Sequence, residues 1–191
     1  MIKIGILSSH NGSGYKTIQN ACNKGILNAE VVLVISNNSE AKVLKEAAKN
    51  DVPNFIINQN LFANENLDAK ITNLLQEYNC DYIYLSGYMK KIEENLLKTF
   101  ENKIINSHPA LLPNFGGKGM YGKNVHEAVI ASKESISGVT IHYVNENYDE
   151  GEYILQKSLT LAENETAESL EEKIKNLESI AIIESFQKII N

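Results

Sequence analysis

The sequence has no arginine and no tryptophan, and only two cysteines and three prolines occur among its 191 residues. Every basic side chain is therefore a lysine, so an anion site must use lysine ammonium groups, backbone N–H groups or helix N-termini. Cys22 and Cys80 are too few for a disulfide framework and lack the C-x-x-C spacing of a metal site, which predicts two reduced thiols. No apolar run reaches the ~18 residues of a membrane span, and no signal peptide is recognisable.

The composition is otherwise that of an ordinary globular protein. Hydrophobic residues make up 43% and charged residues 22%, which excludes disordered and collagen-like chains. A length of 191 residues fits one domain over 1–191, which we expect to lie in the cytoplasm. The net charge of -6 argues against a nucleic-acid partner, and nothing suggests a membrane partner. No metal-ligand spacing occurs, so we predict no metal, and the sequence leaves the oligomeric state open.

Strand-like and helix-like segments alternate along the first hundred residues. The predicted strands span 2–8, 30–36, 52–57, 81–86 and 103–105, and the predicted helices span 15–24, 40–50 and 67–78. A helix at 123–132, strands at 137–144 and 152–159, and an amphipathic helix at 165–190 with Thr166 as its N-cap complete the pattern. This order predicts an α/β fold, with a Rossmann-like, mostly parallel sheet, helices on both faces and an antiparallel C-terminal extension.

A glycine-rich turn separates the first strand from the first helix. Its residues Asn11, Gly12, Ser13 and Gly14 expose backbone N–H groups at a helix N-terminus, where a phosphate is well placed. The turn matches neither G-x-G-x-x-G nor the P-loop, so it favours a single phosphate monoester over a nucleotide cofactor. Lys16 could add positive charge. The alternative is a plain strand-to-helix turn.

Asn106 and His108 stand two residues apart at the end of a predicted strand and therefore point to the same side. A carboxamide can donate a hydrogen bond to a developing oxyanion, and an imidazolium can donate one and also exchange a proton. Pro109 and Pro113 stiffen the turn that follows, where one X-Pro bond could be cis. The alternative is a buried histidine that caps the turn.

Asp149 lies in the polar turn between the last two predicted strands. A carboxylate there could reach a neighbouring histidine, orient its ring and raise its pKa. The alternatives are an ordinary turn residue for Asp149 and a structural role for His142, which stands inside an apolar strand. His10 and His126 have no evident partner in the sequence.

Three segments together resemble the motifs of one family. SHNGSG (9–14), NSHPALLP (106–113) and GVTIHYVNENYDEG (138–151) are similar to the phosphate loop and the two signatures of the phosphoribosylglycinamide formyltransferases, a folate-dependent family. The resemblance implies that 10-formyltetrahydrofolate donates its formyl group to the amine of glycinamide ribonucleotide, in de novo purine (IMP) synthesis. It implies that Asn106 and protonated His108 stabilise a tetrahedral oxyanion and that Asp149 keeps His108 charged and assists proton transfer.

The resemblance also implies the residues that bind the two substrates. The ribonucleotide would contact Asn11, Gly12, Ser13, Gly14, Lys175 and Glu178. The folate would contact Met89, Lys90, Lys91, Ile92, Asn106, Asn145, Glu146, Asn147, Tyr148 and Asp149. The chain departs from the family at Gly14-Tyr15-Lys16, where an asparagine usually ends the loop, and near position 64, where a family arginine has no counterpart.

Related activities share the same catalytic trio. Formyltetrahydrofolate deformylases normally carry an additional N-terminal regulatory domain, and methionyl-tRNA formyltransferases normally carry a basic RNA-binding barrel. Sugar-nucleotide N-formyltransferases lack the short phosphate loop at the first turn. A non-catalytic binding module with the same fold is a further alternative, against which the intact Asn106, His108 and Asp149 argue. The four glycines of segment 114–122 lead us to expect a mobile loop.

Overall fold

The chain divides into two compact units in a computed structural model that describes residues 1–190. The first unit holds residues 1–105 together with Ile190, and the second holds residues 106–189. The division falls inside strand β5 (Ile104–His108), which begins in one unit and ends in the other. The single domain expected over 1–191 stays a prediction.

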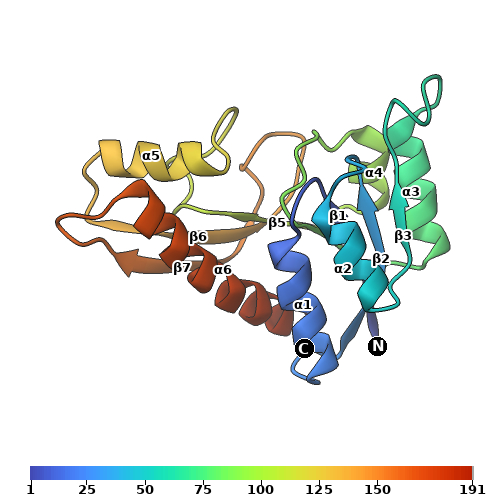
Figure 1. The fold of residues 1–191 in the computed structure, drawn as a ribbon, viewed down its shortest axis with the longest axis horizontal. Coiled ribbons are helices and arrows are strands. Elements are labelled where there is room, and N and C mark those ends of the chain that lie inside the picture. The colour runs from blue at the N-terminus through green and yellow to red at the C-terminus, as the bar shows by residue number, and fades with distance from the viewer. Residues whose placement is uncertain (191) are drawn as a thin grey trace. The chain divides into compact units, whose positions relative to one another are not determined.

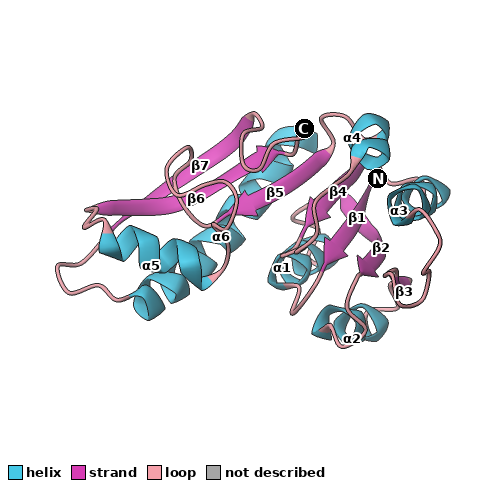
Figure 2. Cartoon of the chain, turned by 90° about the horizontal axis from the view of Figure 1, so that it is seen from above, coloured by secondary structure: helices cyan, strands magenta, loops and turns pink. Residues whose placement is uncertain are grey.

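The first unit is a parallel sheet covered by helices. Its strands β1 (Ile2–Ser8), β2 (Ala29–Ser36), β3 (Asn54–Ile56) and β4 (Tyr82–Leu85) pair in the order β3-β2-β1-β4. Its helices are α1 (Ser13–Asn23), α2 (Lys42–Lys49), α3 (Leu67–Glu77) and α4 (Glu94–Thr99). Figure 2 shows α1 and α2 on one face of these strands and α3 and α4 on the other. Strands covered on both faces need nearly continuous apolar sequence, and β1 accordingly buries Ile4, Ile6 and Leu7 completely.

Helix α4 is absent from the sequence-based prediction because its start signal comes from far along the chain. The helix has six residues, too few for an apolar periodicity to be recognised. The carboxylate of Asp68, in helix α3, accepts hydrogen bonds from the amides of Asn95 at 2.7 Å and Leu96 at 3.3 Å. These bonds satisfy amide groups that the first helical turn cannot pair internally.

The second unit combines an antiparallel pair of strands with two helices. These elements are α5 (Lys123–Ala131), β6 (Ile136–Tyr143), β7 (Tyr153–Thr160) and α6 (Ala167–Ile190), coloured yellow to red in Figure 1. Lys157 of β7 pairs with Glu184 of α6 at 2.7 Å. The amide of Ser169 donates to Thr166 Oγ1 at 3.2 Å, which confirms Thr166 as the N-cap of α6.

The seven strands follow the order β3-β2-β1-β4-β5-β6-β7, with β6 and β7 antiparallel. This order confirms the predicted fold class. Strand β5 is longer than the predicted 103–105, because it continues through Asn106, Ser107 and His108. Polar side chains in a row give no strand signal, so the end of β5 could not be recognised from apolar residues alone.

Both cysteines are free thiols, as expected. Burial raises the pKa of Cys22 to about 11 and that of Cys80 to about 12, so neither is a reactive thiolate at neutral pH. No helix within residues 1–190 is long and apolar enough to cross a membrane. In the described part of the chain, no cluster of three or more His, Cys, Asp and Glu side chains is arranged to hold a metal ion.

Candidate active site

Asn106, His108 and Asp149 come together in the second unit, although Asp149 follows Asn106 by 43 positions in the sequence. Strand β5 presents Asn106 and His108 on the same face, because side chains two apart in a strand share a side. Asp149 comes from the turn between β6 and β7, and its Oδ2 lies 3.5 Å from His108 Nδ1. The side chains of His108 and Asp149 are 3% and 12% exposed, so water screens their electrostatic interaction little.

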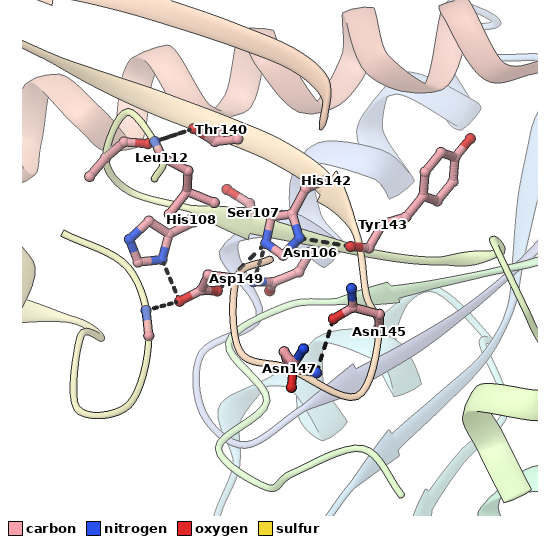
Figure 3. Close-up of polar contacts among 12 residues, drawn as sticks. Asn106, Ser107, His108, Leu112, Thr140, His142, Tyr143, Asn145, Asn147 and Asp149 are labelled. Carbon is pink, nitrogen blue, oxygen red and sulfur yellow. Dashed lines mark hydrogen bonds and ion pairs between the residues drawn. The ribbon is translucent and has the colours of Figure 1, made fainter. Parts of the chain in front are cut away.

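His142 of β6 is a fourth member, for which the sequence had left a structural role as an alternative. Figure 3 shows the Asp149 carboxylate between the rings of His108 and His142. His142 Nε2 lies 3.6 Å from Asp149 Oδ1 and 3.2 Å from Asn106 Nδ2. Its Nδ1 lies 2.8 Å from the Tyr143 carbonyl oxygen, so Nδ1 carries a proton and donates.

The tautomer of His142 fixes the amide of Asn106. Because Nδ1 donates to the Tyr143 carbonyl, Nε2 is the acceptor that receives one N–H of the Asn106 carboxamide. The second N–H of that carboxamide is then available to another acceptor. The signal in the sequence was weak, because a single histidine in an apolar strand is usually a buried structural residue.

A loop backbone holds both His108 and Asp149. The Phe115 carbonyl oxygen lies 2.7 Å from His108 Nε2, and the Gly117 amide donates to Asp149 Oδ2 at 2.9 Å. Gly116, between them, leaves little room for a side chain, because a Cβ there would lie 2.5 Å from Leu112 Cδ2 and 3.3 Å from Asp149 Cβ. The glycines of this segment predicted a mobile loop. These backbone contacts could not be recognised from the sequence, because backbone groups are the same whatever the residue type.

The same loop is anchored where it leaves strand β5. The Leu112 amide donates to Thr140 Oγ1 at 3.0 Å, and that hydroxyl donates to the Ala110 carbonyl at 2.8 Å. Gln156 Nε2 donates to the Leu112 carbonyl at 2.9 Å. The bond between Leu112 and Pro113 is cis, an arrangement that the sequence had left open for one of the X-Pro bonds.

The electrostatics of the pair differ from the expectation. Burial lowers the pKa of His108, and this effect exceeds the raising effects of the Asp149 charge and the Phe115 carbonyl. Asp149 thus raises the pKa of His108, as expected, but burial lowers it more, so the neutral ring is favoured in the free protein. Burial raises the pKa of Asp149, but its contact with His142, the neighbouring His108 and the hydrogen bond from the Gly117 amide together bring it below its ordinary value. Asp149 is thus ionised and faces a neutral His108 at neutral pH.

The glycine-rich turn of the first unit is shaped by its contacts. Gly12 is the N-cap of α1 with φ 65°, and a Cβ there would lie 2.3 Å from Val43 Cγ2. Ser9 Oγ donates to Asn37 Oδ1 at 2.6 Å and accepts from the Met89 amide at 2.8 Å. Gly14 is buried, whereas Asn11 and Ser13 are exposed and accessible to a ligand.

Lys16, in the first turn of α1, lies close to a carboxylate. Its ammonium group lies 3.8 Å from Glu46 Oε2 of helix α2, and its side chain is 50% exposed. The positive charge that was to compensate for the altered loop is therefore partly neutralised by a carboxylate of the same unit.

A cavity of about 390 Å³ lies in the first unit beside the stretch 89–92. Lys90, Lys91 and Ile92 line it, whereas Met89 lies next to it along the chain and is 45% exposed. The other lining residues are Asn37, Ile57, Asn58, Gln59, Asn60, Leu67, Asp68, Ile71, Tyr88, Glu93 and Leu96. Three of the four residues assigned to the folate from 89–92 thus border one hollow with amide, apolar and charged side chains in its walls.

The remaining predicted residues lie in the second unit. In the turn 145–149, Asn145 Oδ1 accepts from the Asn147 amide at 3.0 Å, Tyr148 is 50% exposed and Asp149 has φ 60°. On α6, Lys175 pairs with Glu171 at 2.5 Å, and Glu178 accepts a hydrogen bond from Ser107. The turn and α6 therefore flank strand β5 through Asp149 and Glu178.

The model of one family, described as formyl transferase, matches residues 2–186. The chain belongs to the formyl transferase family. This formyl transferase is also 32% identical over 179 residues to the phosphoribosylglycinamide formyltransferase of Bacillus subtilis, with 93% of this chain and 89% of that relative covered. A solved structure of glycinamide ribonucleotide transformylase 1 from Geobacillus kaustophilus matches it with a TM-score of 0.91 at 31% identity, over 100% of both chains.

Plant relatives of this formyl transferase are longer. The chloroplastic phosphoribosylglycinamide formyltransferase of Vigna unguiculata is 37% identical over 183 residues, which are 95% of this chain. The chain spans 59% of that relative's length, and 63% of the corresponding protein of Arabidopsis thaliana. A formyltetrahydrofolate deformylase from Pseudomonas syringae matches with a TM-score of 0.84 at 19% identity, a likeness of fold alone.

Proposed function

We propose that this formyl transferase moves the formyl group of 10-formyltetrahydrofolate to the amine of glycinamide ribonucleotide. The products are N-formylglycinamide ribonucleotide and tetrahydrofolate, in purine synthesis in the cytoplasm. The convergence of Asn106, His108 and Asp149 carries this proposal, because it provides an oxyanion donor, a proton acceptor and a charge that stabilises the acceptor once it is protonated. The bacterial relative that this chain covers over 89% of its length has the same activity in its name.

The neutral state of His108 in the free protein suits a base better than a resident cation. As the amine attacks the formyl carbon, its nitrogen gains a bond and must lose a proton, which the neutral imidazole takes up. The free N–H of the Asn106 carboxamide donates to the oxygen that becomes negative, and the new imidazolium stabilises it as well. The folate nitrogen leaves when its bond to the formyl carbon breaks, and it receives the proton from His108.

Asp149 acts on this cycle through the charge of its carboxylate. Its Oδ2 faces His108 Nδ1 at 3.5 Å, so a proton on Nδ1 creates a buried ion pair. That pairing favours the imidazolium, which exists only after the amine has given up its proton. Asp149 therefore stabilises the state in which charge develops more than the state in which the substrates first bind.

The first unit would supply binding groups for both substrates. The exposed Asn11 and Ser13 and the amides beside Gly12 and Gly14 suit the phosphate of the ribonucleotide, because a helix N-terminus favours an anion. The cavity beside Lys90, Lys91 and Ile92 suits the folate, whose ring is flat and whose tail is acidic. The turn 145–149 would contact the folate as well. Lys175 and Glu178 would complete the ribonucleotide site.

The test is an absorbance assay for tetrahydrofolate release, with and without glycinamide ribonucleotide. Release that requires the ribonucleotide would support the transferase and the phosphate loop together. Release without any amine would instead indicate a deformylase. No release by folded protein under either condition would contradict both and leave another acceptor amine or a binding role.

A further inference from the structure

Strand β5 carries a third polar side chain, Ser107, between Asn106 and His108. Because successive side chains of a strand point to opposite faces, Ser107 is turned away from the face that holds the other two. Figure 3 shows its side chain pointing away from Asp149. Its hydroxyl oxygen lies 2.5 Å from Oε1 of Glu178, on helix α6 and 71 residues further along the chain.

The direction of this hydrogen bond follows from the groups involved. An ionised carboxylate can only accept, so the single hydroxyl proton of Ser107 is donated to Glu178. Hydrogen bonds of this kind, from a hydroxyl to a carboxylate, are short and about twice as strong as neutral ones. Among the described residues, no second hydrogen bond to Glu178 is present, so Oε2 keeps its capacity to accept.

The surroundings of Glu178 make this partner important. Burial raises the pKa of Glu178 above its ordinary value, and the Ser107 hydrogen bond and the Lys175 charge offset only part of this effect. Lys175 lies one helical turn away on α6, where it is already paired with Glu171 at 2.5 Å. From helix α5, His126 faces Glu171 and Lys175, and burial lowers the pKa of His126. The Ser107 hydroxyl is therefore the group from β5 that favours the ionised carboxylate.

We propose that Ser107 is a positioning residue, whose hydroxyl holds the Glu178 carboxylate in one orientation and leaves Oε2 to accept hydrogen bonds from the ribonucleotide. This inference rests on the proposed function, because it takes Glu178 as a contact of that substrate. It adds that residue 107, between the two members of the active-site pair, serves the acceptor substrate rather than the formyl donor. Strand β5 would thus contribute Asn106 and His108 to the reaction itself and Ser107 to the binding of the ribonucleotide.

The test compares Ser107→Ala with Ser107→Thr in steady-state kinetics. Ser107→Ala should raise the KM for glycinamide ribonucleotide about five- to tenfold, the effect expected when one hydrogen bond to a carboxylate is lost. Its KM for 10-formyltetrahydrofolate and its kcat should change less than about twofold. Ser107→Thr keeps the hydroxyl and suits a strand, so it should restore the KM. Ser132→Ala, which removes a hydroxyl that donates to the Val129 carbonyl, is the matched control.

Two further measurements separate positioning from a general structural effect. In Ser107→Ala the ribonucleotide KM should begin to rise at a higher pH on acidification than in the wild type, because the lost bond had lowered the pKa of Glu178. In a Glu178→Gln background, Ser107→Ala should have little further effect, because the partner charge is gone.

Provided that the wild type is active, three results would each overturn the inference. The first is an unchanged ribonucleotide KM in Ser107→Ala, and the second is an equal change in the KM values of both substrates. The third is additivity of the Ser107→Ala and Glu178→Gln effects. A wild type without ribonucleotide-dependent turnover would overturn the proposed function, and this inference with it. A melting temperature close to that of the wild type shows that each variant is folded.

Discussion

The two candidate functional regions depend on different parts of the protein, the backbone in the first unit and side chains in the second. In the first unit, the turn at 9–14 depends on backbone shape, because Gly12 is left-handed and leaves no room for a side chain beside Val43. In the second unit, the cluster around Asp149 depends on ionisable side chains that are almost completely buried. An anion can be held by backbone N–H groups, whereas proton transfer needs groups that titrate. The first region should therefore fail through misfolding, and the second through loss of rate.

The largest effect should come from Asn106→Ala, which we expect to lower kcat at least ~100-fold. A lost oxyanion donor costs about 3–4 kcal/mol of transition-state stabilisation. The free energy of unfolding should change by less than about 1 kcal/mol, because Asn106 is partly exposed and donates one long hydrogen bond. The transferase assay and urea unfolding measure the two quantities, with Asn124→Ala as a carboxamide control on an exposed contact. A rate within tenfold of wild type would refute the role of Asn106.

Gly12→Ala should disrupt the turn at 9–14 by destabilising the fold. The new methyl group would lie 2.3 Å from Val43 Cγ2 and 2.8 Å from Val43 Cβ, and Val43 is completely buried and β-branched. We expect a loss of about 3 kcal/mol in the free energy of unfolding, from overpacking and a left-handed alanine.

The matched control for this clash is Gly25→Ala. Gly25 has nearly the same φ, 67°, but nothing lies within 4 Å of the added methyl group, so it should lose only about 1 kcal/mol. Urea unfolding of the two variants compares the clash directly. Equal losses would show that the close approach at Gly12 contributes nothing.

The smallest expected effect concerns the pKa of His108 in the second unit. The His108 imidazole should titrate below its ordinary value of about 6.5, because burial outweighs the Asp149 charge. Asp149→Asn should lower that pKa further, since the removed charge had raised it. NMR titration of the ring measures both values, with His108→Gln to assign the signal.

The pH dependence of stability follows from the lowered pKa of His108. The folded state binds the His108 proton less tightly than the unfolded chain does. The stabilising contribution of His108 is therefore present above pH ~6.5 and is lost as the pH falls through the folded-state pKa. A titration midpoint above 6.5 would contradict this account and restore a resident imidazolium.

Much of the fold could be predicted because the apolar pattern determines it locally. Strand β1 and the amphipathic segments of α3 and α6 have periodicities that a single sequence displays. Helix α4 could not be found, because the Asp68 carboxylate that caps it lies 27 residues before Asn95. The end of β5 was missed for a similar reason, since its pairing comes from other strands while its own residues are polar.

The residues of the candidate site also fall into two groups, those that a local sequence pattern predicts and those that depend on the fold. The spacing of Asn106 and His108 predicted a shared face, and a carboxylate in the later turn predicted Asp149 as their partner. His142 and the Phe115 carbonyl were not predicted, because their contribution depends on which atoms the fold brings within 3.6 Å. The raising effect of Asp149 on the pKa of His108 was predicted, but the larger lowering effect of burial was not, since burial is a property of the packed structure.

The loop that contacts His108 and Asp149 does so with peptide groups. The Phe115 carbonyl and the Gly117 amide are present whatever side chains stand there, and both residues have positive φ, 58° and 90°. Selection on this segment would therefore preserve a backbone path rather than a set of functional groups. Residues that tolerate left-handed conformations could replace one another, and Gly116 alone would be barred from change by the room it leaves for Leu112 and Asp149. A sequence comparison would record such a segment as variable in chemistry and constant in conformation.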